Sequence, residues 1–369
     1  MTSTSLLPAP LAGIRGFLVP MKCADLAATT QFFIERLGFR IDAIFPADNP
    51  RTAILSGCHI TLRLGVDVAD GVTKLDVLCD DAFQLGGEAK TLTAPNGAEI
   101  RLVPADPPMK QPVNRQELVL SRTRDGATWT VGRAGLRYRD LLPNRHGGAF
   151  IASHIRILEG GPVPDYVHFH KIRFQMIFCR KGWVRVVYEG RGEPFVLNAG
   201  DCVLQPPQIR HRVLESSAGA EVIEIGTPAE HITMADHEMS LPSATLEPDR
   251  EFDGQRFVRY EQKHASWNPW RIEGFVASDT GIGAATRGLA GVRVVRPKTS
   301  PGANQQQHAS EFCFFFVLSG RMTVLQGADA YSLAADDSIT IPGETPYSFV
   351  DCSADLELLE VTLPAELSI

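Results

Sequence analysis

The chain has 369 residues. A single hydrophobic core of ordinary size does not organise a chain of this length, so we expect two or three domains. Hydrophobic residues make up 44% and charged residues 21%, and a net charge of -7 without a long basic block argues against a nucleic-acid partner. No apolar run approaches the roughly 20 residues of a membrane span, and the N-terminus lacks the pattern of a signal peptide. The seven cysteines are scattered without a CxxC pair, which indicates reduced thiols and a cytoplasmic location.

The first elements predicted along the chain are a strand, a helix and three more strands. A strand candidate at 13–20 precedes a helix at 24–37, in which Leu26, Phe32 and Leu37 lie roughly on one face and which Gly38 ends. The segments FRIDAIFP, RTAILSG and CHITLRLG follow as strands. The segments LDVLCDD and LTAPNGAEIRLVP predict a further strand and a hairpin, with only a vestigial helix (AFQLGG) between them.

This order of elements, with the phrase DLAATTQFFIERLGF, resembles the glyoxalase or vicinal-oxygen-chelate module, here over residues 12–106. The resemblance implies metal ligands on the first and last strands, but the residues near those positions are Phe17, Leu18 and Arg101, which do not serve as ligands. His59 is the only remaining candidate. We therefore expect a structural or oligomerising domain, or part of a lid, that binds no metal.

From about Trp129 onward, short apolar or alternating runs between Gly and Pro residues predict β-structure. His168 and His170 are one residue apart, so in a strand both side chains point to the same face. His211 follows in AGDCVLQPPQIRHRVLE, and Gln175 stands five residues after His170. Three imidazoles and one oxygen donor form a ligand set for Fe, Mn, Ni, Cu or Zn.

The spacing of these residues resembles the two motifs of the cupin superfamily, which are small double-stranded β-helix barrels of the jelly-roll type. Positions of the first motif are matched by His168, His170 and Gly182, with Gly161 one residue out of register; the second is matched by Gly200, Pro206 and His211. The resemblance implies a metal held by His168, His170 and His211 in a barrel over residues 129–235. Gln175 stands where the family has Glu, so it either completes the ligand set or lies just outside it.

The C-terminal block repeats the pattern, which indicates a bicupin with a second barrel at 291–365 and a connector at 236–290. Aligning Gly320 with Gly182 places four residues on the ligand positions of barrel one: Gln306, His308, Cys313 and, after a two-residue deletion, Tyr347. Only His308 is retained, so we expect no metal in barrel two. The predicted fold class is therefore mainly β, with two jelly-roll barrels preceded by a small α+β glyoxalase-like domain.

Four residues flank the predicted ligands and are candidates for contacts with a substrate or with the ligands: Tyr166, Arg173, Gln205 and Arg210. An arginine beside a metal commonly anchors a carboxylate, although plain surface solvation explains these arginines as well. Alternation from Gln175 puts Ile177 inside the barrel. The arginine-rich segment GRAGLRYRDLLPNRHGG, just before barrel one, could form one wall of the site.

By resemblance, we expect an enzyme with one divalent metal per chain, iron first and Mn, Ni or Zn as alternatives. The leading hypothesis is an Fe(II) dioxygenase acting on a small anionic, enolisable or aromatic substrate. A non-redox isomerase, hydrolase or lyase and a non-catalytic metal- or ligand-binding protein remain alternatives. Because cupins and glyoxalase modules associate readily, we also expect a homodimer.

Overall fold

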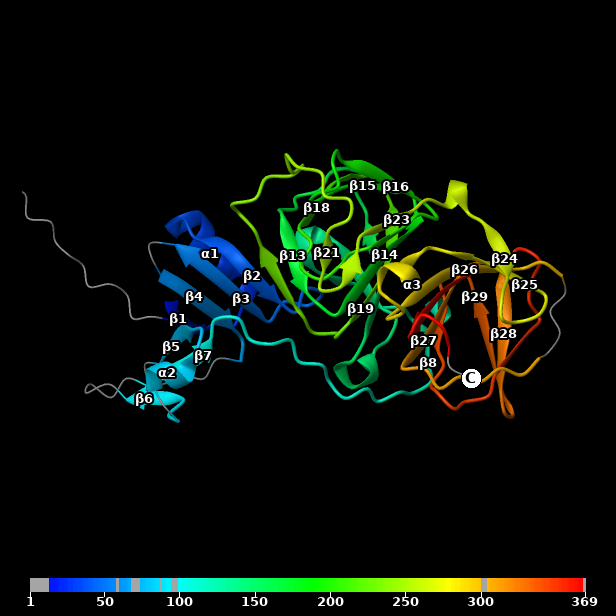
Figure 1. Ribbon diagram of the computed structural model, residues 1–369, viewed down its shortest axis with the longest axis horizontal. Helices are drawn as coiled ribbons and strands as arrows, with labels where there is room; N and C mark the ends of the chain where they lie inside the picture. The colour runs from blue at the N-terminus through cyan, green and yellow to red at the C-terminus, as the bar shows by residue number, and fades with distance from the viewer. Residues whose placement is uncertain are drawn as a thin grey trace, which may run out of the picture. The chain divides into compact units, whose positions relative to one another are not determined.

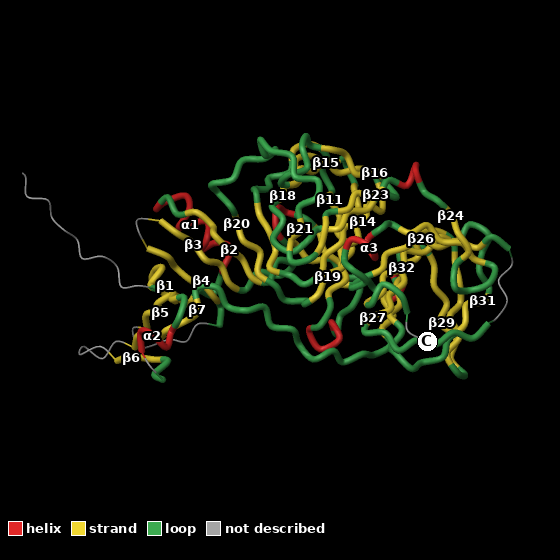
Figure 2. Tube along the Cα trace, viewed as in Figure 1, coloured by secondary structure: helices red, strands yellow, loops and turns green. Residues whose placement is uncertain are grey.

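The computed structural model describes residues 13–57, 60–67, 74–86, 88–93, 99–299 and 304–367 (Figures 1 and 2). The chain divides into two compact units, one formed by Met1–Pro46 and Pro50–Met109 and the other by Ala47–Asn49 and Lys110–Ile369. Within the described ranges, no helix has the length and apolar character needed to cross a membrane.

The N-terminal unit contains the predicted β-α-β-β-β order followed by a shorter second set of elements. The first set is β1 (Ile14–Lys22), α1 (Leu26–Leu37), β2 (Arg40–Phe45), β3 (Thr52–Gly57) and β4 (Ile60–Gly65). The second is β5 (Lys74–Cys79), α2 (Ala82–Gly86), β6 (Thr91–Thr93) and β7 (Glu99–Pro104), and the strands order as β2-β3-β4-β1-β5-β7-β6. Asp25 caps α1 by accepting a hydrogen bond from the Ala28 amide at 2.9 Å, and Gly38 ends it in the left-handed conformation.

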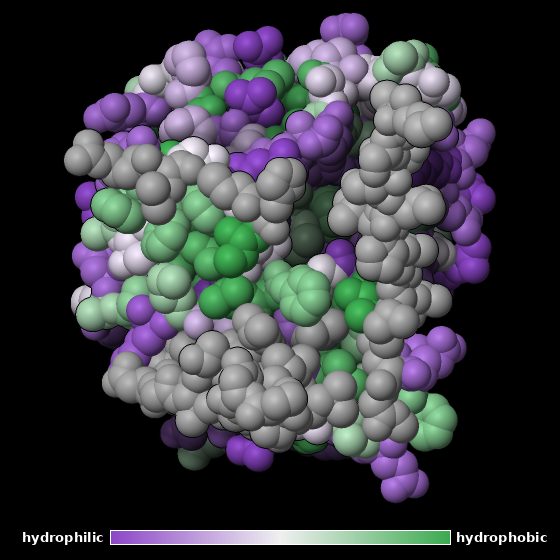
Figure 3. Space-filling view, turned by 90° about the vertical axis from the view of Figure 1, so that its left-hand side faces the viewer, coloured by the Kyte–Doolittle hydropathy of each residue, from purple (hydrophilic) through white to green (hydrophobic). Residues whose placement is uncertain are grey.

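Several large hydrophobic side chains stay on the surface of this unit, among them Phe17 on β1 and Phe32 on α1, each about half exposed. Figure 3 looks onto this unit and shows hydrophobic residues gathered between hydrophilic ones. Arg101 forms a bidentate ion pair with the buried Asp76 on the neighbouring strand, with a donor distance of 2.6 Å from Nε. His59 lies outside the described residues, and the glyoxalase assignment stays a prediction.

Barrel one is a sandwich of two antiparallel sheets, drawn mainly in green in Figure 1. One sheet has the order β23-β17-β14-β19-β11-β10-β9. The other runs β16-β15-β18-β13-β20, with β12 paired to β18. The bounds are β9 (Thr130–Val131), β10 (Arg137–Asp140), β11 (Ile151–Ile157), β12 (Gly161–Pro162), β13 (His168–Lys171), β14 (Phe174–Lys181), β15 (Trp183–Tyr188), β16 (Phe195–Asn198), β17 (Cys202–Leu204), β18 (His211–Ser216), β19 (Ala220–Thr227), β20 (Ile232–Ala235) and β23 (Val258–Tyr260).

Barrel two has the same two-sheet design, with the order β24-β25-β26-β32-β27-β30-β8 in one sheet and β29-β28-β31 in the other. The bounds are β8 (Val119–Ser121), β24 (Trp267–Pro269), β25 (Phe275–Asp279), β26 (Gly291–Pro297), β27 (Phe312–Ser319), β28 (Arg321–Gln326), β29 (Asp329–Ala334), β30 (Ser338–Thr340), β31 (Ser348–Val350) and β32 (Glu357–Leu363). Residues 236–290, which we expected to be a connector, supply β23 to barrel one and β24 and β25 to barrel two. They also form the hairpin β21 (Glu251–Phe252) and β22 (Gln255–Arg256) and the short helix α3 (Ile282–Ala285).

The two barrels share one hydrophobic core because β14 and β27 each bury both of their faces. Phe174, Met176 and Phe178 on β14 pack in the same cluster as Phe312, Phe314 and Phe316 on β27. The alternate residues point inward, as Ile177 does in barrel one and Phe315 in barrel two. A strand buried on both faces reads as a continuous apolar run, which explains the sequence FCFFFVL of β27.

Candidate metal centre

The three predicted histidines meet at the point where β13 and β18 pair. His168 lies directly opposite His211 in the ladder, and His170 is two residues further along the same face of β13. Ring centroids are 4.3 Å apart for His168 and His211, and 5.2 Å apart for His170 and each of the other two. One ring nitrogen from each residue lies within 4.8 Å of the others, a separation that could hold one metal ion.

Each imidazole is fixed through Nδ1, which leaves Nε2 for a ligand. The Nδ1 of His168 lies 2.8 Å from the Tyr166 carbonyl oxygen, and that of His211 lies 3.0 Å from the Ile209 carbonyl oxygen. A carbonyl only accepts, so both Nδ1 atoms carry the proton and both Nε2 atoms carry a lone pair. The third, His170, has its Nδ1 at 2.9 Å from Thr233 Oγ1. Metal-binding histidines are typically oriented in this way, by a hydrogen bond from the other ring nitrogen.

Burial keeps the three imidazoles neutral. It lowers the pKa of His168 and His170 well below the ordinary value, and the charge of Arg133 and the repulsion between imidazoles if more than one were protonated add to the effect. Burial likewise lowers the pKa of His211 to about 4. Neutral imidazole is the form that binds metal, so the site needs no deprotonation at neutral pH. The His168 Nε2 is buried without any hydrogen-bond partner, which a bound cation would supply.

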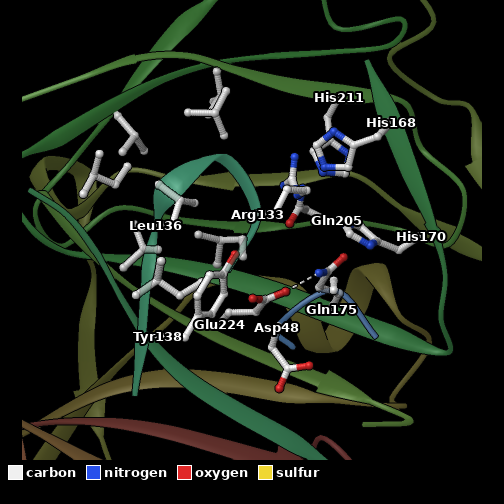
Figure 4. A pocket seen from close by; sticks show the side chains of 18 of the residues that line it. Asp48, Arg133, Leu136, Tyr138, His168, His170, Gln175, Gln205, His211 and Glu224 are labelled. Atoms are coloured by element: carbon white, nitrogen blue, oxygen red, sulfur yellow. Dashed lines mark hydrogen bonds between the residues drawn. The ribbon is translucent and has the colours of Figure 1, made fainter. Parts of the chain in front are cut away.

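Gln175 is oriented by a carboxylate that sequence reasoning missed. Its Nε2 donates to Glu224 Oε1 at 2.5 Å, while its Oε1 is buried without a partner and points toward His170 (Figure 4). Glu224 lies on β19 opposite Ile177, and its only signal in the sequence is a charge at an inward position of the apolar strand AEVIEIGT. One acidic group near the centre therefore comes from β19 and contacts Gln175.

Two further ion pairs border the centre. Arg133 pairs with Asp165, which also accepts from the Val213 amide at 2.9 Å and lies 3.6 Å from His168 Nδ1. Asp48, which belongs to the barrel unit, pairs with Arg145. Arg133 and Asp165 thus supply charge next to the histidines without leaving an unpaired ion.

These groups open onto a cavity of about 100 Å³ inside barrel one. Polar residues line one part, and aliphatic residues of the barrel interior line the rest. Gln205 lines the cavity, as do Arg133, Leu136 and Tyr138 from the arginine-rich segment before the barrel. His231 also borders it, with its ring centroid 5.2 Å from that of His170.

The structure places the other predicted neighbours of the site outside this lining. Tyr166 packs edge-on against His168, with ring centroids 5.9 Å apart. Arg173 pairs with Glu311 of barrel two at 2.5 Å, and Arg210 pairs with Asp236 at 3.0 Å. The arginine at the cavity is thus Arg133 rather than the two expected from closeness in sequence.

At the corresponding positions of barrel two, each residue makes other contacts within the protein, although the Nε2 of His308 is buried without a hydrogen-bond partner. Gln306 and Tyr347 pair through their backbones, and His308 Nδ1 accepts from the Ser310 amide at 3.2 Å. Cys313 is buried in the core of barrel two, and the Tyr347 hydroxyl accepts from Arg271 at 3.3 Å. Arg271 in turn forms an ion pair with Glu360, which is fully buried.

A second acidic and histidine cluster lies where the barrels meet. It consists of His154, Glu221 and Asp336. Both carboxylates already have cationic partners, Arg156 at 3.0 Å from Glu221 and Arg180 at 3.2 Å from Asp336. We therefore describe this cluster as an ion-pair network between the barrels.

Comparison with known proteins finds similarity at the level of fold. No family model and no curated protein matches the chain. Among solved structures, YlbA from E. coli covers 70% of this chain and 95% of its own at 11% identity and a TM-score of 0.49. Oxalate decarboxylase from Bacillus subtilis covers 68% of this chain and 77% of its own at 13% identity and a TM-score of 0.49. Oxalate decarboxylase from Lactobacillus farciminis covers 68% and 87% at 13% identity and a TM-score of 0.48.

At this level of similarity the neighbours carry no information about chemistry. The bicupin fold instead follows from the two sandwiches and from their repeated strand pairing. Met176 pairs with Leu204 in barrel one, and Phe314 pairs with Thr340 at the corresponding place in barrel two. The chain thus has the fold of a bicupin, with a buried three-histidine set in the first barrel.

Proposed function

We propose that this chain is a metal-dependent enzyme with one divalent ion per chain, held in barrel one by His168, His170 and His211. One observation carries the proposal: the three imidazoles are buried and neutral, with Nδ1 hydrogen-bonded and one ring nitrogen of each within 4.8 Å of the others. Packing alone would leave buried polar atoms without partners at a cost of about 1–3 kcal/mol each. The unpartnered Gln175 Oε1 is a candidate fourth ligand.

Within this proposal, the leading reaction is dioxygenation by iron(II) of a small anionic, enolisable or aromatic substrate. When bound, iron would supply a Lewis acid and electrons for chemistry with O₂. The ligand set of the protein is neutral, which leaves the full positive charge for an anionic substrate. Arg133 adds a cation at the cavity, and the aliphatic walls exclude water from the reacting groups.

A non-redox isomerase, hydrolase or lyase using Mn, Ni or Zn is the second candidate, and Glu224 is the observation that favours it. Burial raises the pKa of this carboxyl, whereas the hydrogen bond from Gln175 and the charge of Arg133 work in the opposite direction. A carboxyl with a raised pKa inside the cavity can take up a proton and return it.

The metal site is tested by comparing two histidines at matched positions of the two barrels. We expect as-isolated protein to contain about one transition-metal ion per chain by elemental analysis. His170→Ala should lose most of it, whereas His308→Ala, the matched change in barrel two, should retain it. Equal metal content in both variants, or none in the folded wild type, would contradict the site.

The reaction is tested on protein loaded with a single metal. Iron-loaded protein should consume O₂ with at least one member of a panel of enolisable and catecholic acids. Turnover without O₂ in manganese- or zinc-loaded protein would instead establish the second candidate. Stoichiometric ligand binding with neither reaction would identify a non-catalytic binding protein.

That the chain forms a homodimer stays a prediction, which analytical ultracentrifugation of the full chain would test.

A further inference from the structure

A fourth imidazole, that of His231, lines the cavity of barrel one beside the three proposed ligands. Its side chain is only 6% exposed, so it belongs to the interior of the barrel. One ring nitrogen from each of His168, His170 and His211 lies within 4.8 Å of the others, and His231 is not part of this group. Its position therefore suits contact with a molecule bound at the ion rather than contact with the ion itself.

Strand β20 places His231 beside one of the ligands. Thr233 pairs with His170 across β20 and β13, and its Oγ1 lies 2.9 Å from His170 Nδ1. His231 comes two residues before Thr233, directly ahead of β20, and alternation along an extended chain puts both side chains on one face. The ring centroids of His231 and His170 are accordingly only 5.2 Å apart, with their planes at 76°.

The hydrogen bonds of His231 fix which of its nitrogens carries a proton. Its Nδ1 lies 3.2 Å from the Pro228 carbonyl oxygen, which only accepts, so Nδ1 is the donor. Burial lowers the pKa of His231 although this hydrogen bond works in the opposite direction, and a cation held nearby would disfavour an imidazolium further. The Nε2 therefore presents a lone pair, and it is buried without any hydrogen-bond partner.

A buried acceptor without a partner costs about 1–3 kcal/mol, so this nitrogen calls for a hydrogen-bond donor. The proposed ion binds His168, His170 and His211, which leaves the Nε2 of His231 to a molecule that carries an N–H, O–H or S–H group. A water molecule needs roughly 10–15 Å³ of such space. The cavity of about 100 Å³ thus has room for an ion together with a ligand of that size.

We propose that His231 is a specificity-determining residue of the metal centre, whose Nε2 accepts a hydrogen bond from the ligand atom that binds the ion. It favours small ligands that keep a hydrogen on that atom, such as water, hydroxide, hydrogensulfide, alcohols and amines. Carboxylates, halides and azide have no such hydrogen and gain nothing from it. The proposal rests on the proposed metal centre. The competing explanation is that His231 only packs against His170.

The test uses full-length protein loaded with cobalt(II), whose visible absorption reports ligands bound at the ion without turnover. Hydrogensulfide and chloride are isoelectronic and carry the same charge, but only hydrogensulfide has a hydrogen. His231→Leu removes the acceptor and should lower the affinity for hydrogensulfide about tenfold relative to chloride, the value of one hydrogen bond. His231→Gln keeps an acceptor and should leave this ratio within about threefold of wild type. As a control, His308→Leu removes a buried imidazole with an unpartnered Nε2 from barrel two and should leave the ratio unchanged.

A second measurement needs no folded variant. In zinc-loaded wild-type protein with ¹⁵N-labelled histidine, hydrogensulfide should shift an unprotonated Nε2 resonance that does not respond to zinc itself. Chloride should leave that resonance in place, because it has no hydrogen to donate. The absence of any such shift on saturation with hydrogensulfide would contradict the proposed hydrogen bond.

Three results with the cobalt-loaded protein would also overturn the inference. Equal changes in hydrogensulfide and chloride affinity in His231→Leu would show that the residue only packs. A larger loss for chloride would show that His231 donates, as an imidazolium. Loss of cobalt from folded His231→Leu would make the residue a ligand of the ion. All three leave the metal centre of the wild type intact, whereas wild-type protein that takes up no cobalt would refute the centre and the role of His231 with it.

Discussion

Replacing Glu360 by glutamine should destabilise the barrel unit strongly, although the residue is remote from the metal centre. Glu360 is fully buried on β32 and forms an ion pair with Arg271. It also accepts from Trp270 Nε1 at 3.2 Å and lies 3.8 Å from Arg293. The substitution retains an acceptor for Trp270 but removes the charge that balances Arg271.

The size of the effect follows from the burial of both partners. The Arg271 side chain is only 23% exposed, so little solvent screens the guanidinium once its partner is neutral. Breaking a buried ion pair by removing one charge costs about 3–5 kcal/mol. We expect about 3 kcal/mol for Glu360→Gln, since the amide oxygen keeps part of the hydrogen bonding.

Urea unfolding followed by tryptophan fluorescence measures this change, because all four tryptophans of the chain (Trp129, Trp183, Trp267 and Trp270) lie in the barrel unit. The matched control is Glu366→Gln, which removes a carboxylate paired with Arg293 but 87% exposed. An exposed pair contributes about 0–1 kcal/mol, so the control should unfold almost as the wild type does. Equal effects of the two substitutions would refute the argument that burial decides the energy of this pair.

Two further predictions concern carboxylates of barrel one. Glu224→Ala should weaken cobalt binding about 10- to 100-fold in a chelator competition, because Gln175 loses the group that orients it. Glu224→Gln keeps an acceptor for Gln175 and should retain most of the affinity. Equal losses in both variants would show that orientation of Gln175 is not the cause. Burial by itself raises the pKa of Glu221. The hydrogen bond from His154 and the charges of His154 and Arg156 together lower this pKa by more than burial raises it, so the net pKa lies below the ordinary value of 4.5. The stabilisation by Glu221 should therefore be complete at neutral pH and disappear as the pH falls below about 4.5. The urea midpoints of wild type and Glu221→Gln should accordingly differ at pH 7 and converge in acid. A difference between the midpoints that persists in acid would contradict a lowered pKa of Glu221.

The parts of the site that the sequence predicted are those set by local geometry. His168 and His170 share a face because strand side chains alternate, and the structure brings both to His211. Arg210 comes directly before β18, and its side chain does not line the cavity. Its guanidinium lies 4.2 Å from the ring centroid of Phe169, the residue between the two histidines. Closeness in sequence to a ligand is thus a poor guide to closeness in space within a strand.

The segment that carries Arg133 was expected to form one wall of the site, and it does. Glu224 and the choice of Arg133 among the arginines of that segment were beyond sequence reasoning, for a different reason. Glu224 reaches Gln175 only through the pairing of β14 with β19, which are about fifty residues apart, and one slip of register would turn it to the other face. Arg133 comes from an irregular segment before β10, where no periodicity predicts the direction of a side chain. Pairing across strands, rather than spacing along one strand, therefore places the charged groups of this cavity.

The same pairing places a buried carboxylate at the corresponding position of barrel two. Glu224 lies opposite Ile177 on β14, and Glu360 lies opposite Phe315 on β27, so the two carboxylates occupy the same place in the repeat. In barrel one, the carboxylate contacts a glutamine and the histidine positions remain available to a ligand. In barrel two, Tyr347 stands at the position of His211, and its hydroxyl contacts Arg271, which pairs directly with the carboxylate. A buried carboxylate is common to both barrels, so the difference between them lies in whether it contacts a neutral amide or a guanidinium.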